Sequence, residues 1–503
     1  MQPAVAADGR PSPPGDYPVV VVGSGPGAIQ TSYSLTRLGI RHAVISADEV
    51  AGGMFRRFPF FQRLLSWTKP HSGADTTARA FEWYDWNSLL ADEPEHRSTM
   101  PRLMDGTSSF PARPEMERNL QVFAEATGVA VRYGCRWETT RREPDGTFVL
   151  GTSDGEYRCR YPIFAVGVAE PFKPSTPGFD AVPHYVDTRP AETYKDKRLV
   201  IIGKQNSGFE LATGLLQWCR RIVLVSPRPA RPSVDLHSLA GVRARYVLPF
   251  EDAMVGGGVF LLDASVERVE RAAEEWHVHT RTSDGGTPFV LDADEVIAAT
   301  GFVAPLQDLP ALGVTTFGQA RLPAQTPYWE SATVPGIFFT GTIGQGAAGL
   351  RKYGHPANSG AVHGARYNAR IVARTVAERL GATIPRPEFA RERLTDHLLE
   401  AATSAPELWN QKAYLAAVVS IDADGAVRDE SIHPLQDFVD RDDPATQVAM
   451  TVETDDRGRI YPFVYLRRGG DLAQHALDPH PLNVYTGDAH RAQLDGILAS
   501  SLV

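Results

Sequence analysis

The chain has 503 residues, 43% of them hydrophobic and 22% charged, with a formal net charge of -9 at pH 7. This length predicts about three domains rather than a single core. The weak acidic charge disfavours nucleic acid and acidic membrane surfaces as partners, and no segment reaches the roughly 18 apolar residues of a membrane span.

The start of the chain and the cysteines indicate where the protein works. Residues 1–16 lack the basic and apolar regions of a signal peptide and are expected to form a disordered lead. Three cysteines, Cys135, Cys159 and Cys219, lie far apart in the sequence and form no CxxC pair. This usage is typical of a reducing compartment, so a cytoplasmic location is expected.

The first folded elements predict a dinucleotide-binding unit. Residues 17–22 are a continuous apolar run suited to a buried parallel strand, residues 28–39 have helical spacing, and residues 42–46 predict a second strand. Between the first strand and the helix stands GSGPGA, which fits the GxGxxG/A pattern. Its first glycine allows the sharp turn, and its second lets the backbone approach a pyrophosphate. The predicted binding residues are Gly23, Ser24, Gly25, Pro26, Gly27 and Ala28.

The acid that usually binds a ribose hydroxyl is missing from the end of the second strand. That position falls at Ser46, and Asp48 or Glu49 follows closely enough to replace it. The alternative is that both acids are solvated loop residues.

Residues 52–110 are rich in aromatic residues, proline and arginine, which predicts an irregular folded insertion beside a ligand. An amphipathic helix over 114–127 follows, and then alternating strands as far as residue 167.

A second, altered glycine turn begins at Gly203. GKQNSGFE follows the apolar strand RLVIIG and keeps the outer glycines, but it has Gln205 in place of the central one. Asn206 and Ser207 can cap the next helix and meet a phosphate, with Gly208 completing the pattern. The following strand ends at Ser226 with no acid, and Arg228 and Arg231 come next, which favours the 2′-phosphate of NADPH. Surface arginines beside a Pro-rich loop are the alternative.

Two more strands, in DADEVIAATGF and GIFFTG, end in glycine turns, and the composition changes beyond about Ile384. Strand-like runs near Ala417, Val448 and Tyr461 predict a small appended domain, structural or lid-forming.

Together the glycine turns, the GG at Gly52 and Gly53, AATGF at Ala298–Phe302 and PGIFFTG at Pro335–Gly341 resemble a known superfamily. It is the two-dinucleotide flavoproteins, which include class B flavin monooxygenases and thioredoxin-reductase-like oxidoreductases. DWNSLL at Asp85, FPARPEM at Phe110 and the segment from Leu350 to Arg370 resemble, more narrowly, the FAD-dependent oxidoreductase domain family. The resemblance covers about residues 17–370.

The resemblance implies an α/β fold with two Rossmann-like domains and an α+β appendage. FAD would bind the first glycine turn, in a domain formed by 17–190 and 297–383. NADPH would bind the second, in an inserted domain over 191–296, and residues 384–503 would form the appendage.

The resemblance also implies which residues surround the flavin. Gly341 and Thr342 would approach its ribityl side, and a helix over about 357–370 would point its N-terminus at the isoalloxazine. Thr300 and Gly301 would line the crossing between the domains. The expected neighbours of the ring are Gly53, Met54, Phe55, Trp67 and Thr68.

Lys69 follows Thr68 where class B monooxygenases have asparagine, so it either bonds an oxygen adduct or pairs with an acid. His71 and His355 are candidate proton carriers, with a structural or surface role as the alternative. Asn206 is the third catalytic candidate, beside Lys69 and His71.

The reaction follows from what the flavin can reduce. With no dithiol and no metal-ligand spacing in the sequence, molecular oxygen is the expected acceptor, which gives a flavin hydroperoxide in a dry pocket. We favour NADPH-dependent N-hydroxylation of a small amine or amino acid, aromatic ones included, in secondary metabolism. Arg56, Arg57 or Arg97 would clamp a substrate carboxylate, unless they are simply solvated.

Two alternatives come from other classes. One is an NADPH-dependent reductase of a low-molecular-weight disulfide or quinone, and the other is a non-catalytic flavin-binding interaction protein. The expected partners are a small amine and O2, and a homodimer is an open option.

Overall fold

The first sheet is built around the first glycine turn. The computed structural model describes residues 8–58, 63–231, 233–236, 239–242, 244–318, 321–352, 354, 357–455 and 457–502. Strands run in the order β2-β1-β5-β4-β3, with β18 also on β5. Strands β2 and β5 are parallel to β1, whereas β3, β4 and β5 form an antiparallel meander. The bounds are β1 Gly15–Val22, β2 His42–Ile45, β3 Trp137–Arg142, β4 Phe148–Thr152, β5 Gly155–Phe164 and β18 Phe338–Phe339.

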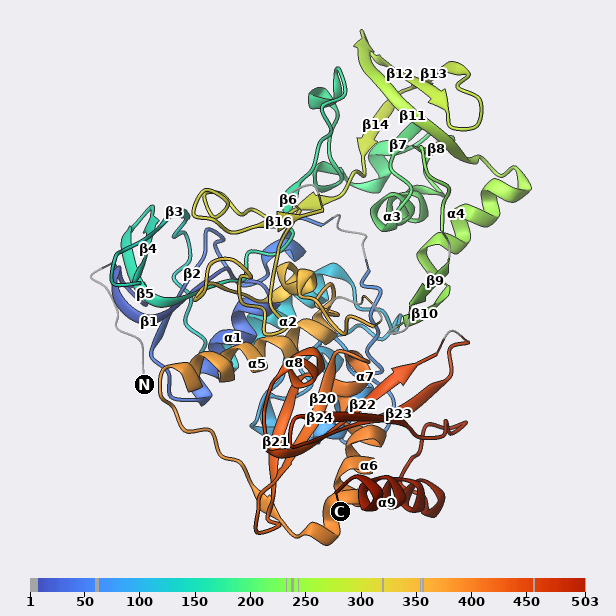
Figure 1. The fold of residues 1–503 in the computed structure, drawn as a ribbon. Coiled ribbons are helices and arrows are strands. Elements are labelled where there is room, and N and C mark those ends of the chain that lie inside the picture. The colour runs from blue at the N-terminus through green and yellow to red at the C-terminus, as the bar shows by residue number, and fades with distance from the viewer. Residues whose placement is uncertain are drawn as a thin grey trace.

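Helices α1 (Pro26–Arg37) and α5 (Val362–Arg379) pack against each other beside this sheet, and α2 (Arg113–Thr127) lies nearby (Figure 1). The predicted irregular insertion is confirmed, because residues 52–110 contain only short 3-10 helices and isolated bridges in the part that is described. The α5 helix begins at Val362, not at 357. Residues 357–359 are held instead by bonds such as Ala357 N to Ala347 O (2.9 Å).

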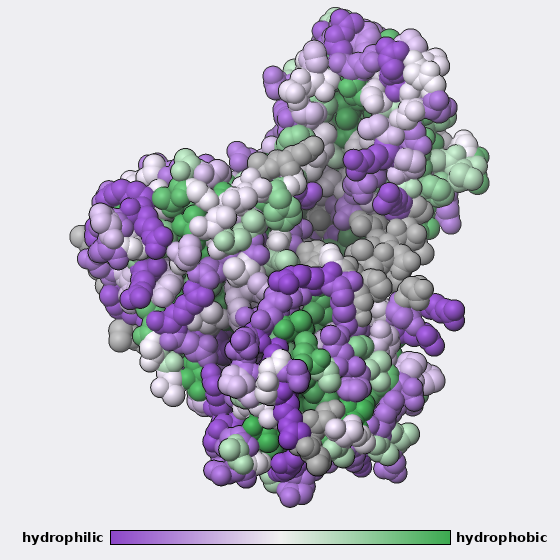
Figure 2. All heavy atoms as spheres, viewed as in Figure 1, coloured by the Kyte–Doolittle hydropathy of each residue, from purple (hydrophilic) through white to green (hydrophobic). Residues whose placement is uncertain are grey.

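A second α/β unit repeats the strand-turn-helix pattern. Its sheet has the order β13-β12-β11-β8-β7-β14, with β7, β8, β11 and β14 mutually parallel. Figure 1 shows that this unit stands away from the rest, and Figure 2 shows it as a projection of mixed hydropathy. Its elements are β7 Arg198–Ile202, α3 Asn206–Leu215, β8 Arg221–Ser226, β9 Ser233–Leu236, β10 Leu239–Val242, α4 Ala244–Val255, β11 Val259–Ala272, β12 Glu275–Thr282, β13 Pro288–Ala293 and β14 Glu295–Ala298.

The passage between the two units is a small antiparallel pair, β6 (Glu170–Pro171) with β15 (Phe302–Val303). Phe179 already packs in the core of the inserted unit, and Val269 N donates to Pro177 O at 2.9 Å. The inserted unit thus begins before residue 191 and ends after 296. A further pair, β16 (Thr316–Phe317) and β17 (Leu322–Pro323), follows the passage.

The C-terminal region forms an antiparallel sheet in the order β19-β21-β20-β22-β23-β24. One core cluster joins Val19 of β1 and Val372 of α5 to Leu415 and Val464 of this sheet, so the region is packed into the first unit rather than appended to it. Its elements are β19 Glu388–Phe389, α6 Leu394–Ser404, α7 Pro406–Asn410, β20 Leu415–Ile421, β21 Val427–Pro434, α8 Leu435–Asp440, β22 Thr446–Thr454, β23 Ile460–Arg468, β24 Asp471–Ala476 and α9 Asp488–Leu502.

The expected disordered lead does not extend over residues 8–16. Tyr157 donates its hydroxyl to Ser12 O at 2.8 Å, and Asp8 pairs with the buried Arg132 at 2.7 Å. The lead is ordered because it supplies a counter-charge to a buried guanidinium. Residues 1–7 lie outside the described residues.

Candidate functional site

The first glycine turn is shaped by two close main-chain contacts. Gly23 has φ of 131°, and a Cβ there would lie 2.5 Å from Ala165 O. A Cβ on Gly27 would lie 2.5 Å from the main chain of Gly341. Packing therefore requires glycine at both positions, and it brings the Gly341 turn against the start of α1.

Beside Gly25, by contrast, the space is open. Its φ of -80° suits any residue, and a Cβ there would have no atom within 4 Å. No side chain caps α1, which begins at Pro26, and a Cβ on Gly53 would lie 3.2 Å from Gly25 Cα. This open cradle at a helix N-terminus fits a pyrophosphate.

Asp48 lies beside this cradle. Ser24 donates its hydroxyl to the Asp48 carboxylate at 2.6 Å, and Asp48 N donates to Ser46 Oγ at 3.1 Å. Glu49, in contrast, is 87% exposed and pairs with Arg56. Of the two acids that could replace the missing ribose ligand, Asp48 is the one placed at the turn.

The second glycine turn repeats this geometry. Gly203 has φ of 129°, and a Cβ there would lie 2.2 Å from Ala299 O, as Gly23 lies against Ala165. A Cβ on Gly208 would lie 2.2 Å from Gly203 O. Gln205 is exposed at the N-cap of α3, where it extends from the position that is glycine in the first turn.

Two side chains of this turn are held by the protein. Asn206 accepts a hydrogen bond from the Tyr246 hydroxyl of α4 at 3.1 Å. Lys204 is buried, donates to Leu262 O at 2.6 Å and pairs with Asp263. Asn206 therefore lies in the nucleotide turn, and no described contact joins it to Lys69 or His71. The sequence analysis did not select Lys204 as a site residue. Its place directly after Gly203, the glycine that ends the strand, was the signal that could have identified it.

Two exposed arginines follow the end of β8. Ser226 closes the strand, and its hydroxyl donates to Arg228 O at 3.4 Å. Arg228 and Arg231 are exposed, and within the described ranges neither makes an ion pair. A 2′-phosphate beside Ser226 would meet them without displacing a carboxylate.

Thr300, Gly301 and Thr342 lie where the two units meet. The Thr300 hydroxyl donates to Phe172 O, and Gly301, with φ of 88°, accepts from Phe172 N at 3.0 Å. Thr342 Oγ1 accepts from Val168 N at 3.2 Å. These contacts fix the crossing next to the Gly341 turn.

The segment after the GG pair forms an aromatic and polar wall. Trp67 stacks on Trp86 at 3.8 Å between ring centroids. Thr68 is fully buried, donates to Asp85 at 2.8 Å and accepts from Asn87 at 3.1 Å. Trp67 Nε1 is a buried donor with no described partner, which suits contact with an absent group. Met54 and Phe55 belong to the 3-10 helix Gly53–Arg56.

The predicted catalytic side chains on this segment face outward. Lys69 is exposed, with Nζ 5.9 Å from the Trp67 ring centroid and 5.7 Å from that of Tyr84, and His71 is exposed. Both side chains therefore lie at the surface, and their catalytic roles stay predictions. His355 lies outside the described residues.

The arginines proposed to clamp a substrate carboxylate already have partners in the protein. Arg97 donates to the carbonyls of Ala91, Thr77 and Asp92 at 2.9, 2.8 and 2.6 Å, so it ties a loop together. Arg56 lies 3.3 Å from Glu117, and Arg57 lies 3.6 Å from Asp48. Each of the three therefore has an acid or a carbonyl partner within the protein.

A histidine that the sequence did not single out completes the wall. His363 begins α5 and packs on Trp86 at 4.8 Å between ring centroids. Asn358 donates its amide to His363 Nε2 at 2.9 Å, which leaves the proton on Nδ1, a buried atom with no described partner. Burial, followed by the charges of Arg366 and Lys412, lowers the pKa of His363 to about 3. His363 is thus a neutral donor at pH 7.

The C-terminal region supports this end of α5. Gln411 accepts from Asn358 N at 2.6 Å and donates to Asn368 at 2.5 Å. Lys412 donates to Trp409 O at 2.9 Å, and burial lowers the pKa of its ammonium to about 8. A Cβ on Gly360 would lie 3.6 Å from Gln345, so the start of α5 adjoins the Gly341–Gly346 turn.

The described residues hold no cluster of three metal-ligating side chains and no helix that is long and apolar enough to cross a membrane. All three cysteines are free. Burial raises the pKa of each thiol, to about 12 for Cys219, so none is poised as a thiolate.

Sequence comparisons match the glycine turns to a known family. A family model described as pyridine nucleotide-disulphide oxidoreductase matches residues 20–341. FAD-dependent oxidoreductase domain-containing protein 2 of Danio rerio is 26% identical over 417 residues, which cover 71% of this chain and 58% of the relative. The chain thus spans less than two thirds of that relative's length.

Solved structures confirm the fold. Bacillithiol disulfide reductase Bdr from Staphylococcus aureus has a TM-score of 0.55 at 16% identity, covering 72% of this chain and 99% of that one. The ornithine N-hydroxylase from Kutzneria sp. 744 has a TM-score of 0.55 at 14% identity, covering 73% and 100%. The predicted fold class, with two Rossmann-like domains, is therefore correct.

Proposed function

Because the chain belongs to the pyridine nucleotide-disulphide oxidoreductase family, we propose that it oxidises NADPH through FAD, passes the electrons to O2 and transfers one oxygen atom to a small amine. Its cofactors are FAD and NADPH, and FAD supplies the step from hydride transfer to oxygen chemistry. The balanced reaction converts the amine, O2, NADPH and a proton into a hydroxylamine, NADP+ and water.

The observation that carries the proposal is the wall beside the start of α5. Thr68 is buried there beside the stacked and partly buried rings of Trp67 and Trp86, and the Nδ1–H of His363 is a neutral donor with no partner among the described residues. Such a donor can hold an oxygen atom or a substrate group without adding charge. Because every thiol in the chain is buried or has a raised pKa, no internal dithiol competes for the electrons.

Product analysis tests the proposal. NADPH oxidation and oxygen uptake should rise together when free amines and amino acids are screened, and one product should gain a single oxygen atom. His363→Phe should keep flavin reduction but divert oxygen to hydrogen peroxide, whereas the exposed His71→Phe should not. NADPH oxidation that never depends on oxygen, with any of the amines, would exclude oxygenation.

The second candidate is a reductase of a low-molecular-weight disulfide or quinone. The similarity in fold to a bacillithiol disulfide reductase favours it. Anaerobic NADPH oxidation that depends on an added disulfide or quinone would support this candidate.

A further inference from the structure

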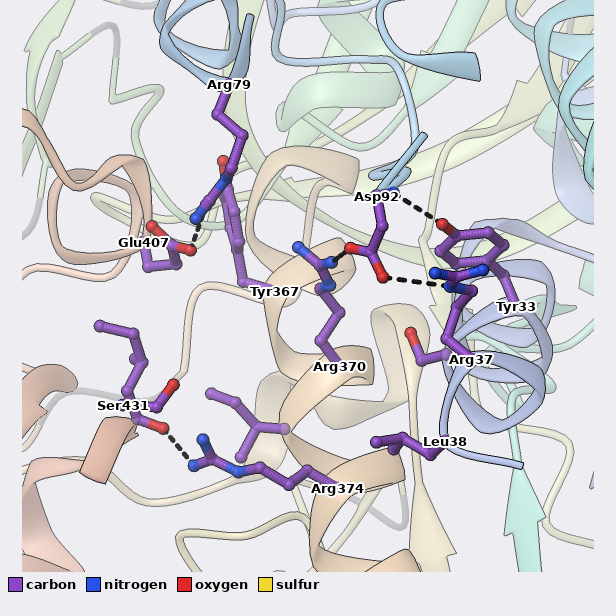
Figure 3. Close-up of a pocket in the computed structure, with 13 residues that line it drawn as sticks. Tyr33, Arg37, Leu38, Arg79, Asp92, Tyr367, Arg370, Arg374, Glu407 and Ser431 are labelled. Atoms are coloured by element: carbon purple, nitrogen blue, oxygen red, sulfur yellow. Dashed lines mark hydrogen bonds and ion pairs between the residues drawn. The ribbon is translucent and has the colours of Figure 1, made fainter. Parts of the chain in front are cut away.

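A cavity of about 320 Å³ lies between parts of the chain that are distant in sequence (Figure 3). The last turns of α1, the middle of α5 and strand β21 of the C-terminal region line it. Its walls include four arginines and two acids, namely Arg37, Arg79, Arg370, Arg374, Asp92 and Glu407.

Three of these arginines form ion pairs with the two acids, and Arg37 also pairs with Glu93 at 2.7 Å. Arg37 lies 3.3 Å from Asp92, and Arg370 pairs with the same carboxylate. Arg79 lies 2.5 Å from Glu407. Figure 3 shows these pairs on the walls of the cavity.

Arg374 has no such partner. Among the described residues no carboxylate lies within ion-pair distance of it, and its Nη2 donates to Ile432 O at 2.6 Å. The same Nη2 lies 3.3 Å from His433 Nε2, whereas Nε and Nη1 make no hydrogen bond with the described residues. Burial, which is only partly offset by nearby charges, lowers the pKa of the guanidinium. A largely buried cation without a counter-ion is costly, and an oxyanion in the cavity would remove that cost.

The cavity is separate from the flavin site. Arg37 stands twelve residues along α1 from Gly25, and Arg374 stands twelve along α5 from Val362. At a rise of 1.5 Å per residue, twelve residues of either helix place the cavity about 18 Å from the helix ends that face the cofactor. A ligand here would not contact the reacting atoms.

We propose that this cavity binds a small organic carboxylate whose acid group pairs with Arg374. Leu38, Ile371 and Ile432 provide an apolar surface for the rest of the ligand. The volume suits a molecule of this size. Since the walls come from α1, α5 and β21, the bound ligand ties the C-terminal region to the first unit.

Calorimetry and thermal melting of the FAD-loaded chain test the site, with acetate, benzoate and inorganic phosphate at constant ionic strength. Benzoate should bind more tightly than acetate or phosphate and raise the melting temperature by about 2 °C or more at saturation. Arg374→Met should weaken benzoate binding at least tenfold. Arg393→Met, which removes an exposed arginine paired with Glu400, should not.

Arg374→Lys keeps the charge but loses the planar fork, and it should also weaken binding in a chain that retains its FAD absorbance. Binding unaffected by both Arg374 variants, or no binding of any probe, would overturn the proposal. If phosphate binds more tightly than benzoate, the site binds free phosphate, and the proposal of a carboxylate ligand is wrong.

Discussion

Gly25 and Gly27 lie two residues apart, yet they are glycines for different reasons. A Cβ on Gly27 meets protein at 2.5 Å, whereas a Cβ on Gly25 meets open space. Gly25→Val should therefore fold and lose FAD, and Gly27→Val should fail to fold stably. Absorbance at flavin wavelengths after reconstitution, together with circular dichroism, separates the two outcomes. A fully yellow Gly25→Val protein would mean that the pyrophosphate lies elsewhere.

Arg228 is exposed and has no acidic partner among the described residues, so its removal should not disturb folding. Arg228→Ala should raise the KM for NADPH more than tenfold and leave that for NADH unchanged, since a lost charged contact is worth about 1.4 kcal/mol or more. Steady-state kinetics with both nucleotides is the measurement. Equal changes for the two would assign Arg228 to a surface role.

The sequence predicted those site residues whose role depends only on their neighbours in the chain. The glycine turns follow from spacing alone, because strand, turn and helix are consecutive there. His363 could not be distinguished from His355, since its importance depends on Trp86 and Asn358, which other segments bring to it. Lys69 was expected to bond an oxygen adduct or to pair with an acid, but its side chain is exposed, and the sequence of an irregular segment does not show which way a side chain points.

At the scale of elements, the strands β1, β2, β7 and β8 and the helices α1 and α2 were predicted correctly because each carries a clear apolar pattern. The start of α5 was placed five residues early. Its position depends on Gln411, which binds Asn358 and Asn368 from the far end of the chain.

Gln411 is almost fully buried, so Gln411→Ala should remove the hydrogen bonds that it makes with Asn358 N and Asn368 Oδ1 and loosen the start of α5. We expect the free energy of unfolding to fall by about 2 to 3 kcal/mol, measured by urea denaturation of the FAD-loaded chain. Gln493→Ala removes a single exposed hydrogen bond at α9 and should cost far less. Equal losses of unfolding free energy in the two variants would show that Gln411 does not stabilise the start of α5 more than an exposed glutamine stabilises α9.

On the scale of the whole molecule, two buried histidines make stability depend on pH. Burial lowers the pKa of both His363 and His433 from 6.5 to about 3. As pH falls from 6.5 towards 3 the unfolded chain binds protons that the folded chain does not, so stability is lost with falling pH. The slope is about 1.4 kcal/mol per pH unit for each histidine. Urea unfolding at pH 7.5 and 5.5 should show a smaller difference for His433→Asn, and an unchanged one for the exposed His71→Asn.

The distribution of the core clusters predicts two cooperative bodies rather than three. The cores of the inserted unit consist almost entirely of residues 179–302, whereas the first unit and the C-terminal region share one cluster through α5. No local pattern could reveal that shared core, because its members come together only in the folded chain. Calorimetry should therefore resolve two transitions. Saturating FAD should raise the one that includes the C-terminal region, and saturating NADP+ should raise the other. A single transition raised by both cofactors would mean that the passage at β6 and β15 couples the bodies more tightly than their separate cores imply.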